Sequence, residues 1–336
     1  MIGNKMILCR MISIVIGACL DRLIGDPQWM PHPVRWIGSL VSALEKLLRL
    51  DGDSPAIERI KGGATAVFVL SVVTQISWGL LVRAYAVHTL AGIALESILC
   101  CYALAARSLQ DASMEVYSPL VEDRPAPASG QNIERARYAV SMIVGRDTTV
   151  LDEKGIIRAA VETVAENTAD GVIAPLFYMM LGGAAGAMAY KAINTMDSMI
   201  GYRNEKYQYY GTVAARMDDI AGFIPARLSG LLLVAAAKLT GMDAAGAWRI
   251  FKRDRYAHKS PNSAQSESAC AGALGVQLAG DAVYFGRVVK KPFIGDPTRE
   301  IEAEDIPRAN RLMYTASGLC LVLVIACLAV AALVMR

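Results

Sequence analysis

Residues 312–335 read LMYTASGLCLVLVIACLAVAALVM, a run of 24 residues without a charged side chain. A helix needs about 20 predominantly apolar residues to cross the hydrocarbon core of a bilayer. Two further runs meet this requirement without a charge, namely residues 62–82 and residues 171–190. The sequence therefore predicts an integral membrane protein with several spanning helices.

Weaker apolar stretches also occur, and each contains a polar or charged side chain that a membrane would have to accommodate. They are residues 84–106 with His88 and Glu96, 220–237 with Arg227, 6–20 with Arg10, and 268–286 with Asp281. Strong and weak stretches together predict an all-α, polytopic membrane bundle. We expect five to seven spanning or re-entrant segments in a single integral membrane domain over residues 1–336.

Lysine and arginine outside the apolar runs predict the orientation of the chain, because cytoplasmic loops are enriched in them. They are frequent in residues 1–61 and 107–170, but only Arg83 separates the first two spans, residues 62–82 and 84–106. Residues 62–106 are therefore expected to form a hairpin with cytoplasmic flanks. Within the second flank, residues 107–160 are expected to form a polar cytoplasmic loop.

The basic loop at residues 191–219 conflicts with a single crossing by residues 171–190. The conflict disappears if residues 171–190 enter and leave the membrane on the same side. Such a re-entrant segment needs a break in the helix whose freed backbone groups are covered by protein. Candidate positions for the break are Pro175, Gly182, Gly183 and Gly186.

The composition excludes several classes of protein. Apolar residues make up 54% and charged residues 19% of the chain, against about 45–50% and about 25% in soluble domains. The formal net charge of +3 is too small to indicate nucleic-acid binding. Seven cysteines, an odd number, argue against a full disulfide framework, and a total of three histidines argues against a Cys/His zinc site. A disordered chain, a secreted disulfide module and an ordinary cytosolic enzyme are thus excluded.

Many of the remaining charges gather in four clusters at the ends of apolar stretches. The first contains Asp21, Arg22, Asp26, His32 and Arg35, and the second contains Arg146, Asp147, Glu162, Glu166, Asn167 and Asp170. The third contains Lys191, Asn194, Asp197, Arg203, Lys206, Asp218, Asp219 and Arg227. The fourth contains Arg253, Asp254, Arg255, His258, Lys259, Asn262 and Glu267.

Each cluster also has a purely structural interpretation. The first would be an interfacial turn, the second a solvated helix face, the third a set of internal salt bridges with interfacial tyrosines, and the fourth a cytoplasmic loop. The functional interpretation is favoured because charge is expensive in a membrane and marks functional sites there.

The acidic residues of the second cluster have a spacing that predicts a site. Glu162, Glu166 and Asp170 are spaced i, i+4 and i+8, so they share one face of an α-helix. Like charges at this spacing repel by about 0.2–0.5 kcal/mol per pair. A cation should therefore offset them, either an arginine or Mg²⁺, which favours a few carboxylates together with substrate phosphates. No common phosphate-binding loop occurs in the right context.

Several motifs span nearly the whole chain. They are LDRLIGDP at 20–27, HPVRWIG at 32–38, GRD at 145–147, ETVAENTADG at 162–171, YKAINTMDSM at 190–199, GYRNEKY at 201–207, DD at 218–219, and His258 with SPNS at 260–263 and ES at 267–268. Together they resemble the adenosylcobinamide-phosphate synthase family, membrane proteins of cobalamin biosynthesis. Long, polar, ordered motifs make this resemblance far more specific than a shared hydropathy pattern.

The resemblance implies a multi-pass enzyme of the inner (plasma) membrane, with a cytoplasmic active site. It implies an ATP- and Mg²⁺-dependent ligase that joins adenosylcobyric acid to (R)-1-aminopropan-2-ol or its O-phosphate through an amide bond. The corrinoid and the amine are its substrates, ATP is a co-substrate, and the lipid bilayer and other late enzymes of the pathway are its expected partners. No nucleic-acid partner is expected.

We assign hypothetical roles on this basis. The proposed metal ligands are Glu166, Asp170, Asp197, Asp218 and Asp219. The proposed substrate- and phosphate-binding residues are His32, Arg35, Lys191, Asn194, Arg203, Lys206, Arg253, Lys259 and Asn262. His258 or Glu267 would accept the proton of the attacking ammonium, which completes a catalytic set with Glu166, Asp170 and Asp197.

Two alternatives remain at this point. Intramembrane charges and a broken apolar segment are typical of transporters. A regulatory membrane protein of related fold, which has lost the chemistry, is the other alternative. The four intact polar clusters favour the enzyme, because a protein that has lost the chemistry should lack such a set.

Overall fold

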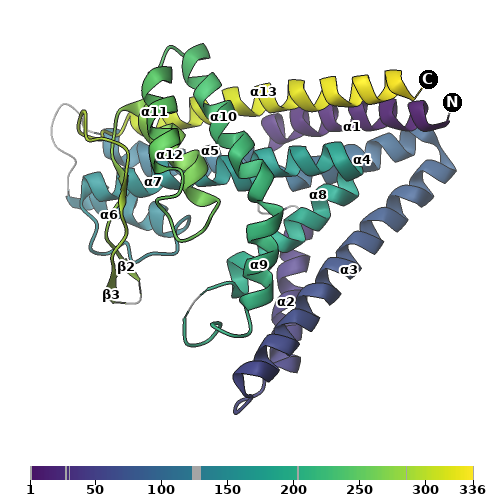
Figure 1. Cartoon of the computed structure of the whole chain (residues 1–336), viewed down its shortest axis with the longest axis horizontal. Helices are drawn as coiled ribbons and strands as arrows, with labels where there is room; N and C mark the ends of the chain where they lie inside the picture. The colour runs from purple at the N-terminus through teal and green to yellow at the C-terminus, as the bar shows by residue number, and fades with distance from the viewer. Residues whose placement is uncertain are drawn as a thin grey trace. The chain divides into compact units, whose positions relative to one another are not determined.

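The computed structural model describes residues 2–26, 29, 31–122, 130–202, 204–284 and 286–335. The chain folds into two compact units (Figure 1). Unit 1 comprises Met1–Ala105, Ala174–Phe223 and Leu321–Arg336, and unit 2 comprises Ala106–Ile173 and Ile224–Cys320. The prediction of one integral membrane domain over residues 1–336 stays a prediction.

Unit 1 is built from helices. They are α1 (Ile2–Ile24), α2 (Pro33–Leu48), α3 (Pro55–Val87), α4 (Thr89–Ala103), α8 (Ala174–Ile200), α9 (Thr212–Ala221) and the C-terminal part of α13 (Asp305–Val334). Helix α1 packs on α4, and both α3 and α4 pack on α8. Side chains at the helix starts fix several boundaries, since His32, Ser54 and His88 each accept a backbone N–H at the start of the following helix.

Unit 2 adds short strands to its helices. The helices are α5 (Ala106–Val121), α6 (Gly130–Ser141), α7 (Glu153–Asn167), the π-helix η1 (Thr168–Ile173), most of α10 (Phe223–Leu239), α11 (Ala244–Asp254), α12 (Ser263–Leu274) and the N-terminal part of α13. Strand β1 (Leu278–Ala279) pairs with β4 (Phe293–Ile294), and β2 (Ala282–Tyr284) pairs with β3 (Arg287–Val289), both antiparallel.

Helix α12 forms the centre of unit 2 and packs against α11 and α7. All of its residues are buried. Its small side chains permit this close packing, because a Cβ on Gly272 would lie 2.5 Å from the carbonyl oxygen of Gly246 in α11. A helix buried on every side can carry Glu267 into the interior of the unit.

The helices confirm the predicted all-α, polytopic class. Among the described residues, four continuous helical segments are long and apolar enough to cross a membrane: Pro55–Val87, Thr89–Val121, Glu153–Ile200 and Asp305–Val334. Helices α9 and α10 would supply a fifth if they are counted as one span. The resulting four or five segments meet the expected five to seven only at five.

Two segments differ from what the sequence predicts. The stretch 268–286 is not a spanning helix, because α12 ends at Leu274 and β1 and β2 follow it. Gly275, with φ 67°, adopts the left-handed conformation that commonly ends a helix. Residues 107–160 are largely helical, since they contain most of α5, all of α6 and the first turns of α7, which pack on one another.

Helix α8 is broken at Gly183, one of the expected positions. This residue has φ 62° and ψ −157°, a conformation almost restricted to glycine. Arg10 of α1 donates to the carbonyl oxygens of Met180 and Leu181 before the break, each at 3.4 Å. Glu96 of α4 accepts the N–H of Ala184 after it, also at 3.4 Å. Arg10 and Glu96, the charged residues inside the apolar stretches 6–20 and 84–106, therefore satisfy the backbone groups that the break in α8 exposes.

Replacing Gly183 with alanine is expected to lower the free energy of unfolding by about 1–3 kcal/mol, the usual cost of holding a side-chain-bearing residue in a sparsely populated backbone region. The new Cβ would also lie 2.5 Å from Oε1 of Glu96. Gly182→Ala is the matched control, because no atom lies within 4 Å of a Cβ placed there. The measurement is thermal unfolding in detergent micelles, and equal midpoints for both variants would contradict the proposed constraint.

Candidate active site

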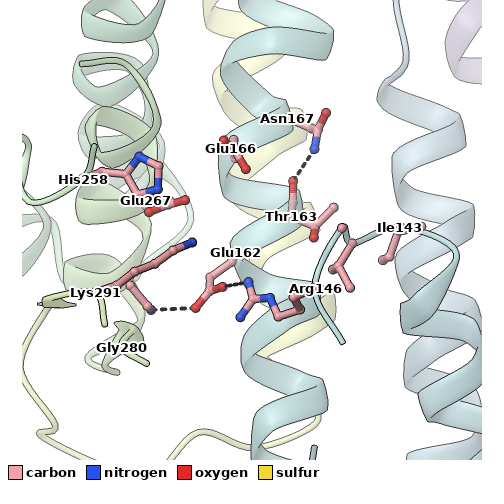
Figure 2. A pocket seen from close by; sticks show the side chains of 13 residues that line it. Ile143, Arg146, Glu162, Thr163, Glu166, Asn167, His258, Glu267, Gly280 and Lys291 are labelled. Atoms are coloured by element: carbon pink, nitrogen blue, oxygen red, sulfur yellow. Dashed lines mark hydrogen bonds and ion pairs between the residues drawn. The ribbon is translucent and has the colours of Figure 1, made fainter. Parts of the chain in front are cut away.

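A polar cavity of about 220 Å³ lies within unit 2 (Figure 2). Its ionisable lining residues are Arg146, Glu162, Glu166, His258, Glu267 and Lys291. The other lining residues are Ile143, Val144, Gly145, Thr163, Asn167, Ala279 and Gly280. Helix α7 supplies one wall, and the opposite wall comes from α12, the loop before it and the strand segment after it.

Glu162 and Glu166 stand one helical turn apart on α7 and face the cavity (Figure 2). Glu162 is buried, and both of its carboxylate oxygens are engaged. Oε2 accepts a hydrogen bond from the Arg146 guanidinium, and Oε1 accepts the Ala279 N–H at 2.6 Å. Oε1 of Glu166 accepts the hydroxyl of Ser263, at the start of α12, at 2.8 Å. Glu162 is thus a structural anchor of the cavity, and Glu166 joins its two walls.

Asp170 does not line this cavity with the two glutamates. The expected i, i+4, i+8 face assumes a regular α-helix, but the π-helix η1 begins at Thr168. Its i→i+5 hydrogen bonds widen the turn, so the side chain eight residues after Glu162 no longer falls on the same face. The spacing correctly predicts the pair Glu162 and Glu166 but not the third member.

His258 lies on the opposite wall, in the loop before α12 (Figure 2). Its Nδ1 accepts the backbone N–H of Ser260 at 3.0 Å. Burial lowers the pKa of this imidazole, against the opposing charge of Glu166. A neutral ring that accepts at Nδ1 carries its proton on Nε2, and it can therefore donate a hydrogen bond from that atom.

Glu267 reaches the cavity from α12 and is 6% exposed. Burial raises the pKa of this carboxyl well above its usual range, and the charges of Glu166 and Glu162 raise it further. Lys291 and Arg146 act in the opposite direction. A carboxyl in this setting therefore binds a proton more readily than an exposed glutamate does.

Lys291 completes the opposite wall, although it belongs to none of the four clusters in the sequence. It follows β3 and lies two residues before β4. Its only sequence signal is the pair Lys290-Lys291 beside a short apolar stretch, which by itself is typical of any surface loop. Arg146 and Glu162 belong to the second cluster, but the sequence predicted no individual role for either.

The other residues of the fourth cluster lie outside the cavity lining. Arg253 donates to Asp254 at 2.6 Å and to Asp296 at 2.7 Å, and these bonds raise the pKa of its guanidinium. Asn262 accepts a hydrogen bond from Arg227 at 3.2 Å, and Lys259 is exposed. Arg253 thus anchors the turn at Asp296, and this role competes with phosphate binding.

The first and third clusters belong to unit 1, apart from Arg227. Nε2 of His32 lies 3.0 Å from Asp26, while its Nδ1 accepts the Val34 N–H at the start of α2. Asn194 donates to Asp218 at 3.4 Å. The same unit contains Asp197, Lys191, Asp219 and the exposed Arg35, whereas Arg203 lies outside the described residues.

Unit 1 contains a hollow of its own, of about 420 Å³, and Lys206 is one of its lining residues. Its ammonium lies 2.9 Å from Glu45 and donates to the Tyr207 hydroxyl at 2.6 Å. The hollow is lined by Ser42, Glu45, Lys46, Arg49, Met199, Lys206 and Tyr207. Its basic side chains fit the anion-binding role assigned to Lys206, which stays a prediction.

No group of three or more His, Cys, Asp or Glu side chains in the described part of the chain is arranged to hold a metal ion. A magnesium ion that arrives with a nucleotide needs fewer protein ligands, since one or two carboxylates and the phosphates suffice. The five proposed metal ligands are divided between Glu166 and Asp170 in unit 2 and the three other aspartates in unit 1.

Together the fold and the cavity define a polytopic helical membrane protein with a cavity lined by acidic and basic side chains. The family model described as "CobD/Cbib protein" matches residues 14–313. The chain belongs to the CobD/CbiB family, which confirms the family expected from the motifs.

Individual relatives agree with this assignment. The chain is 50% identical to "Cobalamin biosynthesis protein CbiB" of Salmonella typhi. The 311 aligned residues make up 93% of this chain and 95% of the relative. It is 48% identical to "Cobalamin biosynthesis protein CobD" of Klebsiella pneumoniae over 315 residues, 94% of this chain and 96% of the relative. The protein of the same name from Geobacter metallireducens is 48% identical over 310 residues, 92% of this chain and 94% of the relative. No solved structure matches the chain.

Proposed function

We propose that this chain is an enzyme of cobalamin biosynthesis that joins adenosylcobyric acid to (R)-1-aminopropan-2-ol or its O-phosphate at the expense of ATP. The product is adenosylcobinamide or its phosphate. One observation carries the proposal: in a chain of the CobD/CbiB family, three glutamates, a histidine, a lysine and an arginine line one cavity. The class of reaction is C–N ligation, and the active site is the cavity of unit 2.

The reaction needs an activated acid, because a carboxylate does not condense with an amine at neutral pH. In the proposed sequence, a carboxylate oxygen of adenosylcobyric acid attacks the γ-phosphorus of ATP, and ADP leaves. The resulting acyl phosphate is attacked at its carbonyl carbon by the amine nitrogen. The C–N bond forms, the C–O bond to phosphate breaks, and inorganic phosphate leaves. The ammonium group of the incoming amine must lose a proton before or during this attack.

Glu267 is the proposed acceptor of that proton. It is buried, it lines the cavity, and burial raises the pKa of its carboxyl, which makes it a stronger base than an exposed glutamate. His258 was the alternative, but its Nδ1 already accepts the Ser260 N–H. The neutral histidine is therefore assigned as a hydrogen-bond donor from Nε2, which would stabilise negative charge on a substrate oxygen.

Mg²⁺ is proposed to accompany ATP, and the donor set of the cavity fits it only in part. The Glu162 oxygens are engaged by Arg146 and Ala279, so Glu166 is the better oxygen ligand in this unit. When bound, Mg²⁺ would neutralise charge on the phosphates. The further ligands proposed are Asp170, Asp197, Asp218 and Asp219.

The environment of the enzyme is part of the proposal. The spanning segments support a location in a membrane, and we propose the cell membrane with the active site on the cytoplasmic side. The proposed substrate-binding roles are kept for His32, Arg35, Lys191, Asn194, Arg203, Lys206, Arg253, Lys259 and Asn262. The bilayer and other late enzymes of the pathway are the proposed partners.

The test uses the full chain purified in detergent. It is incubated with adenosylcobyric acid, MgATP and either free aminopropanol or its O-phosphate, and the products are identified by mass spectrometry. We expect an ATP-dependent amide product with at least one amine. Absence of any amide, together with ATP-independent uptake of a labelled solute into proteoliposomes, would favour a transporter. Full activity in single alanine variants of Glu166, Asp197 and Asp219 would exclude the proposed metal ligands.

A further inference from the structure

We propose that Lys291 binds an oxyanion of a substrate in the cavity of unit 2, and that the Gly145-Arg146-Asp147 loop positions the strand segment that presents this lysine. The inference rests on the proposed function and deepens it, because it assigns the subsite for a carboxylate or phosphate oxygen. The ligand class is an oxyanion, which the carboxylate of the acid, ATP or the phosphorylated amine could each supply.

The charges of the cavity point to this lysine. Three carboxylates line it, so an anionic substrate requires positive charge in return. Arg146 donates a hydrogen bond to the buried Glu162. Lys291 is the other cation among the described lining residues, and its charge acts on both Glu267 and His258. Its ammonium is therefore within electrostatic reach of the proposed base and the proposed donor.

The orientation of Lys291 agrees with a binding role. Figure 2 shows its side chain extending from the strand segment toward the middle of the cavity, below Glu267 and His258 and opposite Glu162. The Nε2 of His258, which carries a proton in the neutral ring, is available as a second donor on the same wall. A charged donor beside a neutral donor is a common arrangement for holding a carboxylate or phosphate oxygen.

The backbone around Lys291 is held on both sides of the residue. Its own N–H donates to Oδ1 of Asp281 at 3.3 Å, and the Gly280 N–H donates to the carbonyl oxygen of Pro292 at 3.4 Å. These bonds join the chain before β2 to the chain before β4. The lysine is thus presented by a cross-linked segment and not by an independent loop.

The Gly145-Arg146-Asp147 loop fastens this segment at two further points. The Asp147 N–H donates to the carbonyl oxygen of Val283 at 2.9 Å, and Oδ2 of Asp147 accepts the Gly286 N–H at 2.8 Å. Arg146 points the other way, into the cavity, and holds Glu162, which in turn accepts the Ala279 N–H. Ala279 has φ 59°, an unusual conformation for a residue with a side chain. The Gly145-Arg146-Asp147 loop therefore holds the β2–β3 hairpin through Asp147, and it holds Ala279 through Arg146 and Glu162.

The first experiment measures binding to the full chain in detergent micelles by calorimetry. MgATP, adenosylcobyric acid and aminopropanol phosphate are titrated separately into wild type and Lys291→Met. The affinity of at least one is expected to fall by about 10- to 150-fold, the range for losing a hydrogen bond to a charged group. The affected ligand identifies the source of the oxyanion. Lys290→Met is the control: it changes the adjacent lysine, which does not line the cavity, and it should bind all three as wild type does.

The positioning role of Asp147 has its own readout. Asp147→Ala should weaken the same ligand as Lys291→Met, and the double variant should bind no more weakly than Lys291→Met alone. Residues that act through one another are non-additive in this way, whereas an independent structural defect would add its own loss. Lys291→Arg, which preserves the charge, should restore most of the affinity.

A measurement on wild-type protein covers the case in which a variant does not fold. Lysines are acetylated with a small reagent, and mass spectrometry follows each site. The bound oxyanion should slow the modification of Lys291 but not that of Lys290. Unchanged binding in Lys291→Met, or unchanged labelling in the presence of all three ligands, would overturn the inference while amide formation by wild type still supported the proposed function. Failure of wild type to form any amide would overturn the proposed function instead.

Discussion

Glu267→Gln is expected to lower the rate of amide formation by about 10²- to 10⁴-fold, the usual contribution of a general acid or base. Glutamine keeps the shape and the polarity of the side chain but cannot accept a proton. Because Glu267 is buried in α12, a glutamine of nearly the same size fills the same space. The fold should therefore tolerate the change, and the loss should appear in kcat.

The measurement is steady-state product formation with thermal unfolding recorded in parallel. Glu300→Gln is the control, since Glu300 is 81% exposed in its pairing with Lys154 and lies outside the cavity. Its rate should match that of wild type. A Glu267→Gln enzyme that keeps its full rate would assign the proton acceptor elsewhere.

Arg146→Ala is expected to lower the free energy of unfolding by about 3–5 kcal/mol, the cost of removing one partner of a buried ion pair. The side chains of Arg146 and Glu162 are only 15% and 7% exposed. Alanine would remove the guanidinium that faces the buried Glu162 carboxylate, while the Ala279 N–H would still donate to it. The same change should also loosen the strand segment that Glu162 holds at Ala279.

Chemical or thermal unfolding in micelles measures this effect. Arg135→Ala is the matched control, because the pair of Arg135 with Glu122 is about half exposed on both sides. Exposed pairs contribute about 0–1 kcal/mol. Adding Glu162→Gln to Arg146→Ala should recover part of the lost stability, since the buried charge is then gone. A small effect of Arg146→Ala, equal to that of the control, would contradict the proposed contribution of the buried pair.

The sequence predicted part of the candidate site from local spacing. Glu162 and Glu166 share a face of α7 because α-helical periodicity places residues four apart on the same side. The same rule failed at Asp170, because the π-helix that begins at Thr168 changes the repeat. No rule of spacing could have paired α7 with α12, which brings Glu166 within 2.8 Å of Ser263.

Charge patterning was informative about location but not about role. Arg253 stands in a basic cluster that predicts phosphate binding, and the sequence did not reveal that its guanidinium also donates to Asp254 and Asp296. Lys291 stands in no cluster, yet it lines the cavity. A charged residue in a sequence does not reveal its partner, because the partner is chosen by packing between segments that are distant along the chain.

By itself, the sequence determined that this is an α-helical membrane protein, where its long apolar segments lie, and which family it belongs to. These properties depend on the length and apolarity of continuous segments and on ordered motifs, which are local. Only the tertiary structure decided that Glu166, His258, Glu267 and Lys291 face one cavity, and that Arg10 and Glu96 complete the break at Gly183. Such groupings depend on which segments pack together, and packing is a collective result of burying apolar surface and satisfying every buried polar group.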